Sequence, residues 1–404
     1  MQQYLSDSPI EKPEDDHFSR WSFAQRIAKV ISSRRDPNCL TIGLYGEWGS
    51  GKTSVLNFIE KELELNDDVI CVKFNPWRFT TEDALLYNFF FTIADSLDCK
   101  LKTKEDDLKE LAKKILPGAS NLTGARGVGE AISNFISLPD LKDFRERLEK
   151  AINEKKKRVL IIIDDVDRLD KEEIYLLFKL IRLSADFKYT AYLLALDKNI
   201  VAASLQDRYS NSTHNAGESF LEKIIQVPIH LPIIEKRVLR DFCFSGVVEA
   251  LNVSEIELDE DQQKVFVKYF DSAFANCLRS PRKVNLYKNI LLFSLPIIKG
   301  EVNPVDVLLI EALRVFFPLL YEGIRDRKDL FVDVDLLPKN DTNEKLKKYI
   351  DDLFIKSNQE ITEGILELLC FLFPNVQGIY PKSDIRYNLI YRQFKSEVQQ
   401  LGSF

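Results

Sequence analysis

The residues best suited to do chemistry lie between positions 43 and 51, where four of the chain's 15 glycines fall within nine residues. The segment Gly46–Thr53, GEWGSGKT, matches the Walker A spacing G-x-x-x-x-G-K-[ST]. Glycines let the backbone curl until successive N–H groups point at one anion, and a helix that begins there adds its positive end. Such a loop is suited to phosphate. Lys52 would place its ammonium between two phosphate groups, and the Thr53 hydroxyl would bind Mg²⁺.

The context of this loop supports the motif. An apolar run, Leu40–Tyr45, precedes it and a helical pattern follows it, which makes a chance glycine turn the weaker interpretation. Lys52 is expected to lie exposed at the start of that helix rather than packed. It would also act in catalysis. The residues expected to contact the nucleotide are Gly46, Glu47, Trp48, Gly49, Ser50, Gly51, Lys52, Thr53 and Ser54.

A second group of reactive side chains follows another apolar run, in the segment RVLIIIDDVDRLD at positions 158–170. Asp164 stands where the strand would end, the position from which a carboxylate reaches Mg²⁺ through water in P-loop proteins (Walker B). Asp165 could accept a proton from the attacking water as a general base. Asp167, Arg168 and Asp170 extend the cluster, and for these three a solvated, helix-capping turn is as good an interpretation as a catalytic role.

Two further segments offer polar groups for catalysis. Asp197 ends the apolar run LLALDKN, where it could sense the terminal phosphate or cap the next helix, and the sequence leaves both open. Further on, LRSPRKVNLYKN places Arg279, Arg282 and Lys283 around a proline that would start a helix. Arg282 could stabilise charge in phosphoryl transfer or report on bound triphosphate. A basic surface turn is the alternative.

Five apolar segments rich in β-branched or aromatic residues predict the strands that position these groups. They begin at Leu40, Val69, Val159, Tyr189 and Ile224. Continuous rather than alternating apolarity is typical of strands buried on both faces, and helical patterns lie between them. The first 232 residues therefore predict an α/β fold with a doubly wound parallel sheet.

One of the intervening helices is clearly patterned. In KEEIYLLFKLIRLSA, from Lys171, the apolar residues recur at helical spacing, and Asp170 with Glu173 can form a capping box at the start. The residues expected on its buried face are Ile174, Leu177, Phe178 and Ile181.

The domain organisation follows from the changes in pattern along the chain. Residues 1–232 form the predicted core, with a solvated helical insertion at about 98–157 whose mixed charges recur at helical spacing. After Pro232 the strand signals fade and helical periodicity dominates. We expect a helical lid at 233–300 and a C-terminal helical domain at 301–404, meeting near Gly300.

Composition excludes several other classes of protein. The net charge of −7 argues against a surface that coats nucleic acid or anionic lipid. Six cysteines without close pairing and three histidines give no zinc spacing, and they fit a reducing cytoplasm. The start of the chain is no signal peptide, and the best candidate for a membrane span, residues 115–138, is interrupted by Arg126 and Glu130. We therefore expect a soluble cytoplasmic protein without a membrane span.

Together these residues resemble the KAP family of P-loop NTPases. The resemblance runs over most of the chain, through SDSPIEKPEDDHFSR, GEWGSGKTS, VKFNPWRF, IIIDDVDRLD, LLALDKNIV, FLEKIIQVPIHLP, SPRKVNLYKN and EALRVFFPLLYEGI. It implies an additional-strand sheet of order 5-1-4-3-2 followed by a helical lid. It also implies that HFSRWSF, with Phe18 and Arg20, lies near the adenine. Many relatives carry transmembrane helices between the two Walker motifs, whereas residues 98–157 here are charged.

The leading functional hypothesis is a Mg²⁺-dependent ATPase that couples ATP binding and hydrolysis to conformational change or assembly with a protein partner. ATP is favoured over GTP because no guanine-specifying Asn-Lys-x-Asp follows the fourth strand. The family's bacterial setting implies phage exclusion or another defence role. One alternative is a slow nucleotide-switch scaffold. The other is a nucleic-acid-remodelling motor, in which the basic segments NEKKKRV and SPRK could line a channel, but the net negative charge of the chain disfavours it.

Overall fold

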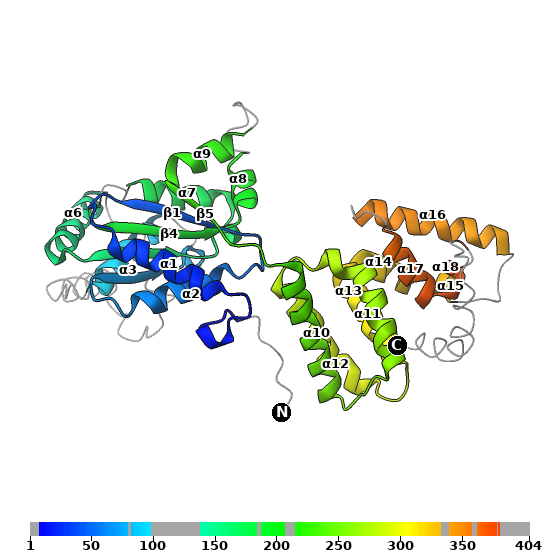
Figure 1. Ribbon diagram of the computed structural model, residues 1–404. Coiled ribbons are helices and arrows are strands. Elements are labelled where there is room, and N and C mark those ends of the chain that lie inside the picture. Colours follow the sequence, from blue (N-terminus) through cyan, green and yellow to red (C-terminus); the bar gives the residue numbers. More distant parts are fainter. Residues whose placement is uncertain are drawn as a thin grey trace, which may run out of the picture. The chain divides into compact units, whose positions relative to one another are not determined.

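The computed structural model describes residues 8–79, 82–97, 138–183, 187–206, 215–332, 339–357, 362–377 and 379. The chain divides into two compact units. Pro9–Pro232 form the first, and Ile233–Phe404 belong to the second. The first unit carries the sheet and the second is built from helices (Figure 1).

The predicted strands form one five-stranded parallel sheet with the order β2-β3-β4-β1-β5. This order confirms the prediction 5-1-4-3-2. Every residue of β3 and β4 is buried, because helices cover both faces and the apolar runs have no solvent side. The strands are β1 (Leu40–Tyr45), β2 (Val69–Phe74), β3 (Arg158–Ile163), β4 (Thr190–Leu196) and β5 (Val227–His230).

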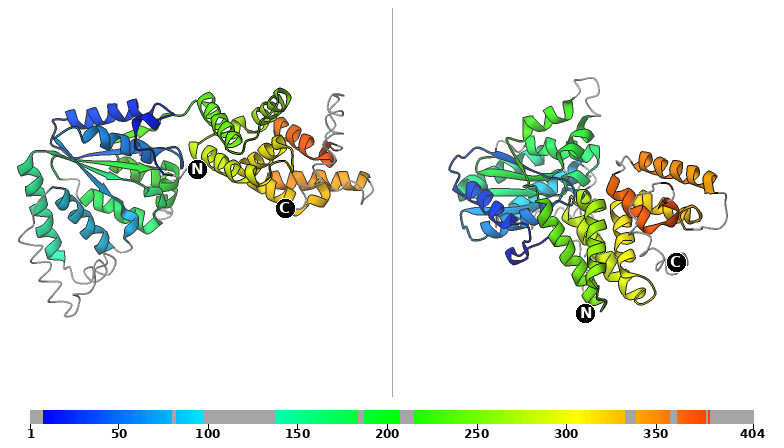
Figure 2. Two further views of the ribbon diagram at one scale, coloured as in Figure 1. Left: turned by 90° about the horizontal axis from the view of Figure 1, so that it is seen from below. Right: turned by 45° about the vertical axis from the view of Figure 1, so that its right-hand side comes forward.

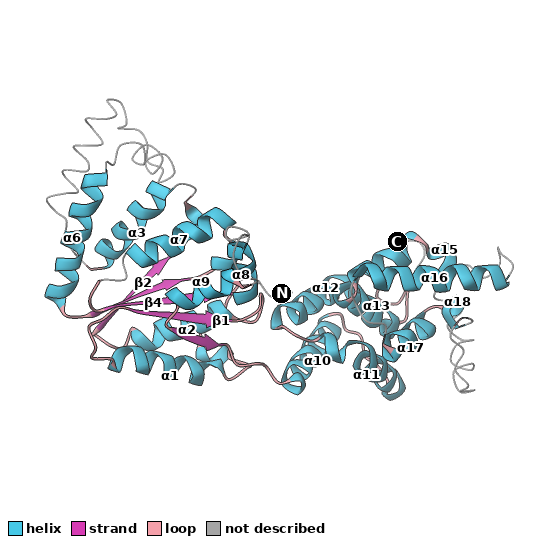
Figure 3. Cartoon of the chain, turned by 90° about the horizontal axis from the view of Figure 1, so that it is seen from above, coloured by secondary structure: helices cyan, strands magenta, loops and turns pink. Residues whose placement is uncertain are grey.

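Helices lie on both faces of the sheet (Figures 2 and 3). α1 (Arg20–Ser33) and α2 (Lys52–Leu63) pack together on one face, over side chains such as Leu160 and Ile162 of β3. The alternate residues Ile161 and Ile163 face the other core. Helices of that second face are α3 (Glu82–Ser96), α6 (Leu138–Lys155), α7 (Lys171–Leu183), α8 (Lys198–Gln206) and α9 (Ala216–Ile224).

α7 confirms both expectations for its segment. Its four predicted core residues, Ile174, Leu177, Phe178 and Ile181, are at most 1% exposed. The capping box is formed as well. The Asp170 carboxylate accepts hydrogen bonds from the backbone N–H groups of Glu172 and Glu173 at 2.9 and 2.8 Å, and the Glu173 carboxylate accepts one from the Asp170 N–H at 3.0 Å.

This cap supports a stability prediction. Asp170→Ala removes the acceptor for two N–H groups at the start of α7, so we expect the free energy of unfolding to fall by about 1 kcal/mol, whereas Asp170→Asn keeps an acceptor and should change it little. Urea unfolding followed by tryptophan fluorescence would measure it, because the chain's three tryptophans, Trp21, Trp48 and Trp77, all lie in the first unit. Equal stability of the two variants would contradict this role of Asp170.

The predicted insertion is only partly described. α6 lies in its second half and packs against α3. Residues 98–137, with nearly all of the candidate membrane segment, lie outside the described residues. Among the helices that the structure does describe, none is long and apolar enough to cross a bilayer.

The described part of the second unit is helical, as the sequence predicts. Phe270 of α11 packs against Phe274 and Tyr287 in its core, and the Tyr287 hydroxyl donates to the Leu308 carbonyl at 2.7 Å. Gly300, with φ of 81°, lies between α12 and α13, and these helices pack together. A division at that residue therefore stays a prediction. Helices here are α10 (Lys236–Val253), α11 (Glu260–Phe274), α12 (Pro281–Ile297), α13 (Pro304–Phe316), α14 (Pro318–Asp326), α15 (Lys328–Phe331), α16 (Lys339–Ser357), α17 (Glu363–Leu372) and α18 (Pro374–Gln377).

Candidate nucleotide site

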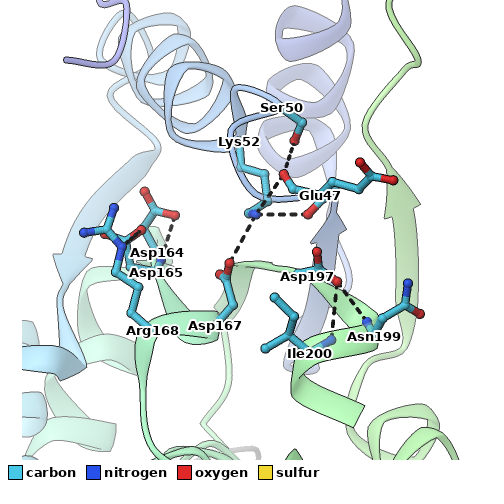
Figure 4. Close-up of polar contacts among 11 residues, drawn as sticks. Glu47, Ser50, Lys52, Asp164, Asp165, Asp167, Arg168, Asp197, Asn199 and Ile200 are labelled. Carbon is cyan, nitrogen blue, oxygen red and sulfur yellow. Dashed lines mark hydrogen bonds and ion pairs between the residues drawn. The ribbon is translucent and has the colours of Figure 1, made fainter. Parts of the chain in front are cut away.

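The sheet brings the predicted reactive segments to one edge. β4 lies between β1 and β3, and the register places Tyr45 beside Leu196 and Ile163 beside Leu194. The residues that follow these parallel strands are therefore neighbours at the carboxyl edge. Figure 4 shows the glycine loop after β1, the acidic turn after β3 and Asp197 after β4 around one space.

The glycine loop needs its glycines for conformation and for close approach. Gly49 and Gly51 have φ of 80° and 96°, in the left-handed region that other residues rarely adopt. A Cβ on Gly46 would lie 2.8 Å from the Ser50 hydroxyl oxygen and 3.3 Å from the Leu231 Cβ. A Cβ on Gly51 would meet nothing within 4 Å, so the loop faces open space there.

The loop is also tied to the end of the sheet. The Gly46 N–H donates to the Leu196 carbonyl at 3.2 Å, and the Leu231 N–H donates to the Tyr45 carbonyl at 2.8 Å. Ser50 closes the loop on itself, because its N–H and its hydroxyl both donate to the Glu47 carbonyl, at 3.2 and 2.6 Å. These bonds hold the backbone in the curled form that presents N–H groups to an anion.

Lys52 is buried, and the expectation that it lies exposed is wrong. It is 7% exposed, because the loop and the acidic turn close around its ammonium. Its Nζ donates to the carbonyls of Gly46 and Glu47 at 3.0 and 3.4 Å and lies 3.6 Å from the Asp167 Oδ2 (Figure 4). Thr53 follows it as the second residue of α2.

The acidic turn gives its carboxylates different surroundings. The Asp164 Oδ1 accepts a hydrogen bond from the Asp165 N–H at 2.8 Å. Asp165 has φ of 56° and directly precedes the one-turn helix η4 (Val166–Arg168). Its Oδ1 lies 2.9 Å from the Arg168 Nε. Burial, and next the charge of Asp164, raise the pKa of Asp165 above its ordinary value, while Arg168 opposes the shift.

Asp167 differs from its neighbours in burial. Its side chain is 6% exposed, and its Oδ1 has no hydrogen-bond partner in the described residues. The solvated-turn interpretation is therefore wrong for Asp167, whereas Asp170 is the helix cap. Sequence reasoning missed the contact between Asp167 and Lys52. A signal was present, because the apolar residues Val166 and Leu169 on either side indicate a turn that packs inward, and they are 0% and 6% exposed.

Asp197 makes the contacts of a helix cap. It is 9% exposed, and its Oδ1 accepts from the N–H groups of Asn199 and Ile200 at 3.0 and 3.4 Å at the start of α8. Its role as a phosphate sensor stays a prediction. Arg282 lies in the first turn of α12 directly after Pro281, so the predicted proline-started helix is confirmed. This helix belongs to the second unit.

The segment before α1 lies along the glycine-loop helix. The Ile10 N–H donates to the Ser54 hydroxyl at 3.1 Å, and the Asn57 side chain donates to the Ile10 carbonyl at 3.4 Å. Ser54 is thus engaged by the chain itself, and its predicted contact with the nucleotide stays a prediction. Arg20 is 6% exposed, and burial lowers its pKa although the charge of Asp16 opposes the shift. The proposed proximity of Arg20 and Phe18 to adenine is also untested.

The residues present fit a magnesium triphosphate. Mg²⁺ at nucleotide sites uses one or two carboxylates or hydroxyls together with phosphate oxygens, which Asp164 and Thr53 can supply. The ammonium of Lys52 can bind phosphate. The buried Oδ1 of Asp167 has no hydrogen-bond partner in the described residues, so additional positive charge in the site would stabilise this carboxylate. No cluster of three or more His, Cys, Asp or Glu in the described residues is arranged to hold a metal ion.

A parallel sheet of this order, with a glycine loop after β1 and carboxylates after β3, defines a P-loop NTPase. Residues 20–297 match the family model described as the KAP family P-loop domain. The chain belongs to the KAP family of P-loop NTPases.

Relatives in sequence are distant. The phage T7 exclusion protein of Escherichia coli K12 is 25% identical over 352 residues, which cover 78% of this chain and 47% of that protein. The chain thus spans about half the length of this relative. An uncharacterized protein of Methanocaldococcus jannaschii is 26% identical over 164 residues, covering 29% of this chain and 84% of that protein.

Among solved structures, the Aeropyrum pernix ORC1 protein in complex with DNA is similar with a TM-score of 0.38 and 16% identity, over 83% of this chain and 84% of that one. A RuvB variant of Thermotoga maritima reaches 0.35 and 14% identity, over 87% and 86%. With TM-scores below 0.5, neither similarity supports a conclusion about function.

Proposed function

We propose that the chain hydrolyses ATP with Mg²⁺, and that ATP binding and hydrolysis change its conformation or its assembly with a protein partner. The observation that supports this proposal is the position of Lys52, inside a curled glycine loop and opposite the carboxylates that follow β3. ATP is preferred over GTP in this proposal, because β4 is followed by Asp197-Lys198-Asn199 and not by a guanine-specifying motif.

Each group would have a distinct part in the reaction. Lys52 donates to oxygens of the β and γ phosphates, and Thr53 and Asp164 hold the metal ion. Mg²⁺ neutralises phosphate charge when bound. Asp165 takes the proton of the attacking water. Burial raises the pKa of Asp165, the direction that makes a carboxylate a stronger base. Arg168 fixes the direction of that carboxylate.

The test is to measure ATP turnover and molecular mass together, with and without nucleotide. We expect Mg²⁺-dependent hydrolysis, faster with ATP than with GTP, and a change of mass or of hydrodynamic size with ATP. No ATP turnover at any Mg²⁺ concentration would contradict the proposal that the chain is an ATPase. Retention of one nucleotide for minutes would favour the slow switch, and stimulation by DNA or RNA would favour the motor.

We further propose that this ATPase acts against phage. The support is the similarity to the phage T7 exclusion protein. Expression of the chain and of its Lys52→Ala variant in a T7-sensitive host, followed by plating of the phage, would test the role. Fewer plaques with the wild type only would support it, and equal plaque counts would contradict it.

The helical unit supplies a prediction about nucleotide sensing. Arg282 lies in the first turn of α12, and its guanidinium could donate the paired, charge-assisted hydrogen bonds that a phosphate group accepts. We propose that it binds the γ-phosphate. Arg282→Ala should then weaken ATP binding by about tenfold and leave ADP binding nearly unchanged, because only the triphosphate offers the contact.

Calorimetric titration with ADP and a non-hydrolysable ATP analogue would measure this difference. Lys283→Ala, which removes the neighbouring charge, and Arg279→Ala, which removes the rival arginine before the proline, are the matched controls. Equal losses for both nucleotides in Arg282→Ala, or no loss, would assign the sensing to another residue.

A further inference from the structure

Asp167 and Lys52 are held against each other inside the site. The Asp167 Oδ2 lies 3.6 Å from the Lys52 Nζ, and the two side chains are 6% and 8% exposed. An ammonium has three donor hydrogens. Two face the carbonyls of Gly46 and Glu47, at 3.0 and 3.4 Å, and the carboxylate of Asp167 lies on the remaining side. The protein itself thus engages Lys52 through two hydrogen bonds and one ion pair.

The charge of Asp167 depends on this one cation. Within the described residues, Lys52 is its ion-pair partner, and its Oδ1 is buried without a hydrogen bond. Asp165 is different, because Arg168 lies 2.9 Å away and compensates its charge. If Lys52 turned its donors toward phosphate, the buried carboxylate of Asp167 would face further negative charge at low dielectric, which is costly.

We propose that Asp167 is a positioning residue that competes with the phosphates for Lys52 and thereby makes nucleotide binding conditional on a divalent cation. With a cation held by Thr53 and Asp164, the site regains the positive charge that Lys52 gives up, and Asp167 no longer opposes binding. Without it, the nucleotide must break the ion pair and leave Asp167 uncompensated. This inference rests on the proposed nucleotide site.

The experiment compares ADP and a non-hydrolysable ATP analogue by calorimetric titration, in Mg²⁺ and in EDTA, for the wild type and Asp167→Asn. Asparagine keeps an oxygen near Lys52 and removes the charge. We expect the wild type to bind nucleotide more weakly in EDTA than in Mg²⁺ by about tenfold or more, and Asp167→Asn to recover most of that loss. A tenfold change in affinity is a small free-energy difference, which the charge of one buried carboxylate is large enough to cause. Affinity in Mg²⁺ should change much less.

Asp170→Asn is the matched control, because it removes the same charge three residues along while its amide can still cap α7. It should retain the wild-type ratio of the affinities in Mg²⁺ and EDTA. Asp167→Ser is a second neutral variant if asparagine is not tolerated. Even without a variant, equal wild-type affinities in Mg²⁺ and EDTA would overturn the inference.

The outcomes separate this inference from the proposed function. No nucleotide binding by the wild type in Mg²⁺ would contradict the function and the inference together. Normal binding with an unchanged Mg²⁺ to EDTA ratio in Asp167→Asn would overturn the inference alone. A shifted ratio in Asp170→Asn as large as that in Asp167→Asn would also overturn it, since general charge and not the contact with Lys52 would then be responsible.

Discussion

Lys52→Ala is expected to lower ATP turnover by about 100-fold or more, because in the proposed mechanism it removes the ammonium that binds the phosphates. A colorimetric phosphate assay and a calorimetric titration with ADP would measure turnover and affinity separately. Lys61→Ala is the matched control, since Lys61 is an exposed lysine in the last turn of the same helix and should tolerate replacement. Turnover near that of the wild type in Lys52→Ala would contradict the phosphate-loop assignment.

The burial of Lys52 adds a consequence for stability. Removal of one partner from a buried ion pair leaves the other charge uncompensated, which costs about 3 kcal/mol. Lys52→Ala should therefore unfold at lower urea concentration than the wild type, and the double variant Lys52→Ala with Asp167→Asn should recover much of the loss. Comparison of turnover in the double variant with that in Asp167→Asn alone then separates the chemistry lost with Lys52 from the lost stability. Equal stability of all three proteins would show that the pair contributes little.

Asp165→Asn is expected to slow hydrolysis by about 10² to 10⁴ while nucleotide affinity changes little, because a general base acts on water only in the transition state. Single-turnover hydrolysis and titration of ADP would give the two quantities. Asp164→Asn is the informative comparison, since loss of the carboxylate proposed to bind Mg²⁺ should raise the Mg²⁺ concentration needed for half-maximal turnover. Near-normal turnover in Asp165→Asn would mean that another residue is the general base, with Asp167 as the next candidate.

The sequence was sufficient to predict features that depend on local pattern. The glycine spacing and the adjacent apolar run predict the phosphate loop because the motif, its strand and its helix are continuous in the chain. The continuous apolarity of β3 and β4 predicts buried parallel strands for the same reason. The capping box of α7 needs only Asp170 and Glu173, three residues apart.

Features that depend on how distant turns face each other could not be predicted in this way. Burial of Lys52 requires the turn after β3 to meet the loop after β1, and the left-handed conformation of Asp165 directs that turn. The engagement of Ser54 by Ile10 likewise joins residues 44 positions apart. Periodicity and propensity act over a few residues: the apolar Val166 and Leu169 could indicate that the turn packs inward, but not that it meets Lys52, and nothing local indicates the contact of Ile10 with Ser54.

Gly46 and Leu231 lie so close together that a Cβ at position 46 would be 3.3 Å from the Leu231 Cβ. Gly46 opens the phosphate loop, and Leu231 leads through Pro232 to Ile233, where the second unit begins. Both are anchored to strand ends, Gly46 at Leu196 of β4 and Leu231 at Tyr45 of β1. A side chain at position 46 would meet the Ser50 hydroxyl oxygen first, at 2.8 Å, and Leu231 next. The phosphate loop and the segment that leaves the sheet toward Pro232 are therefore anchored side by side, at the carboxyl ends of β4 and β1.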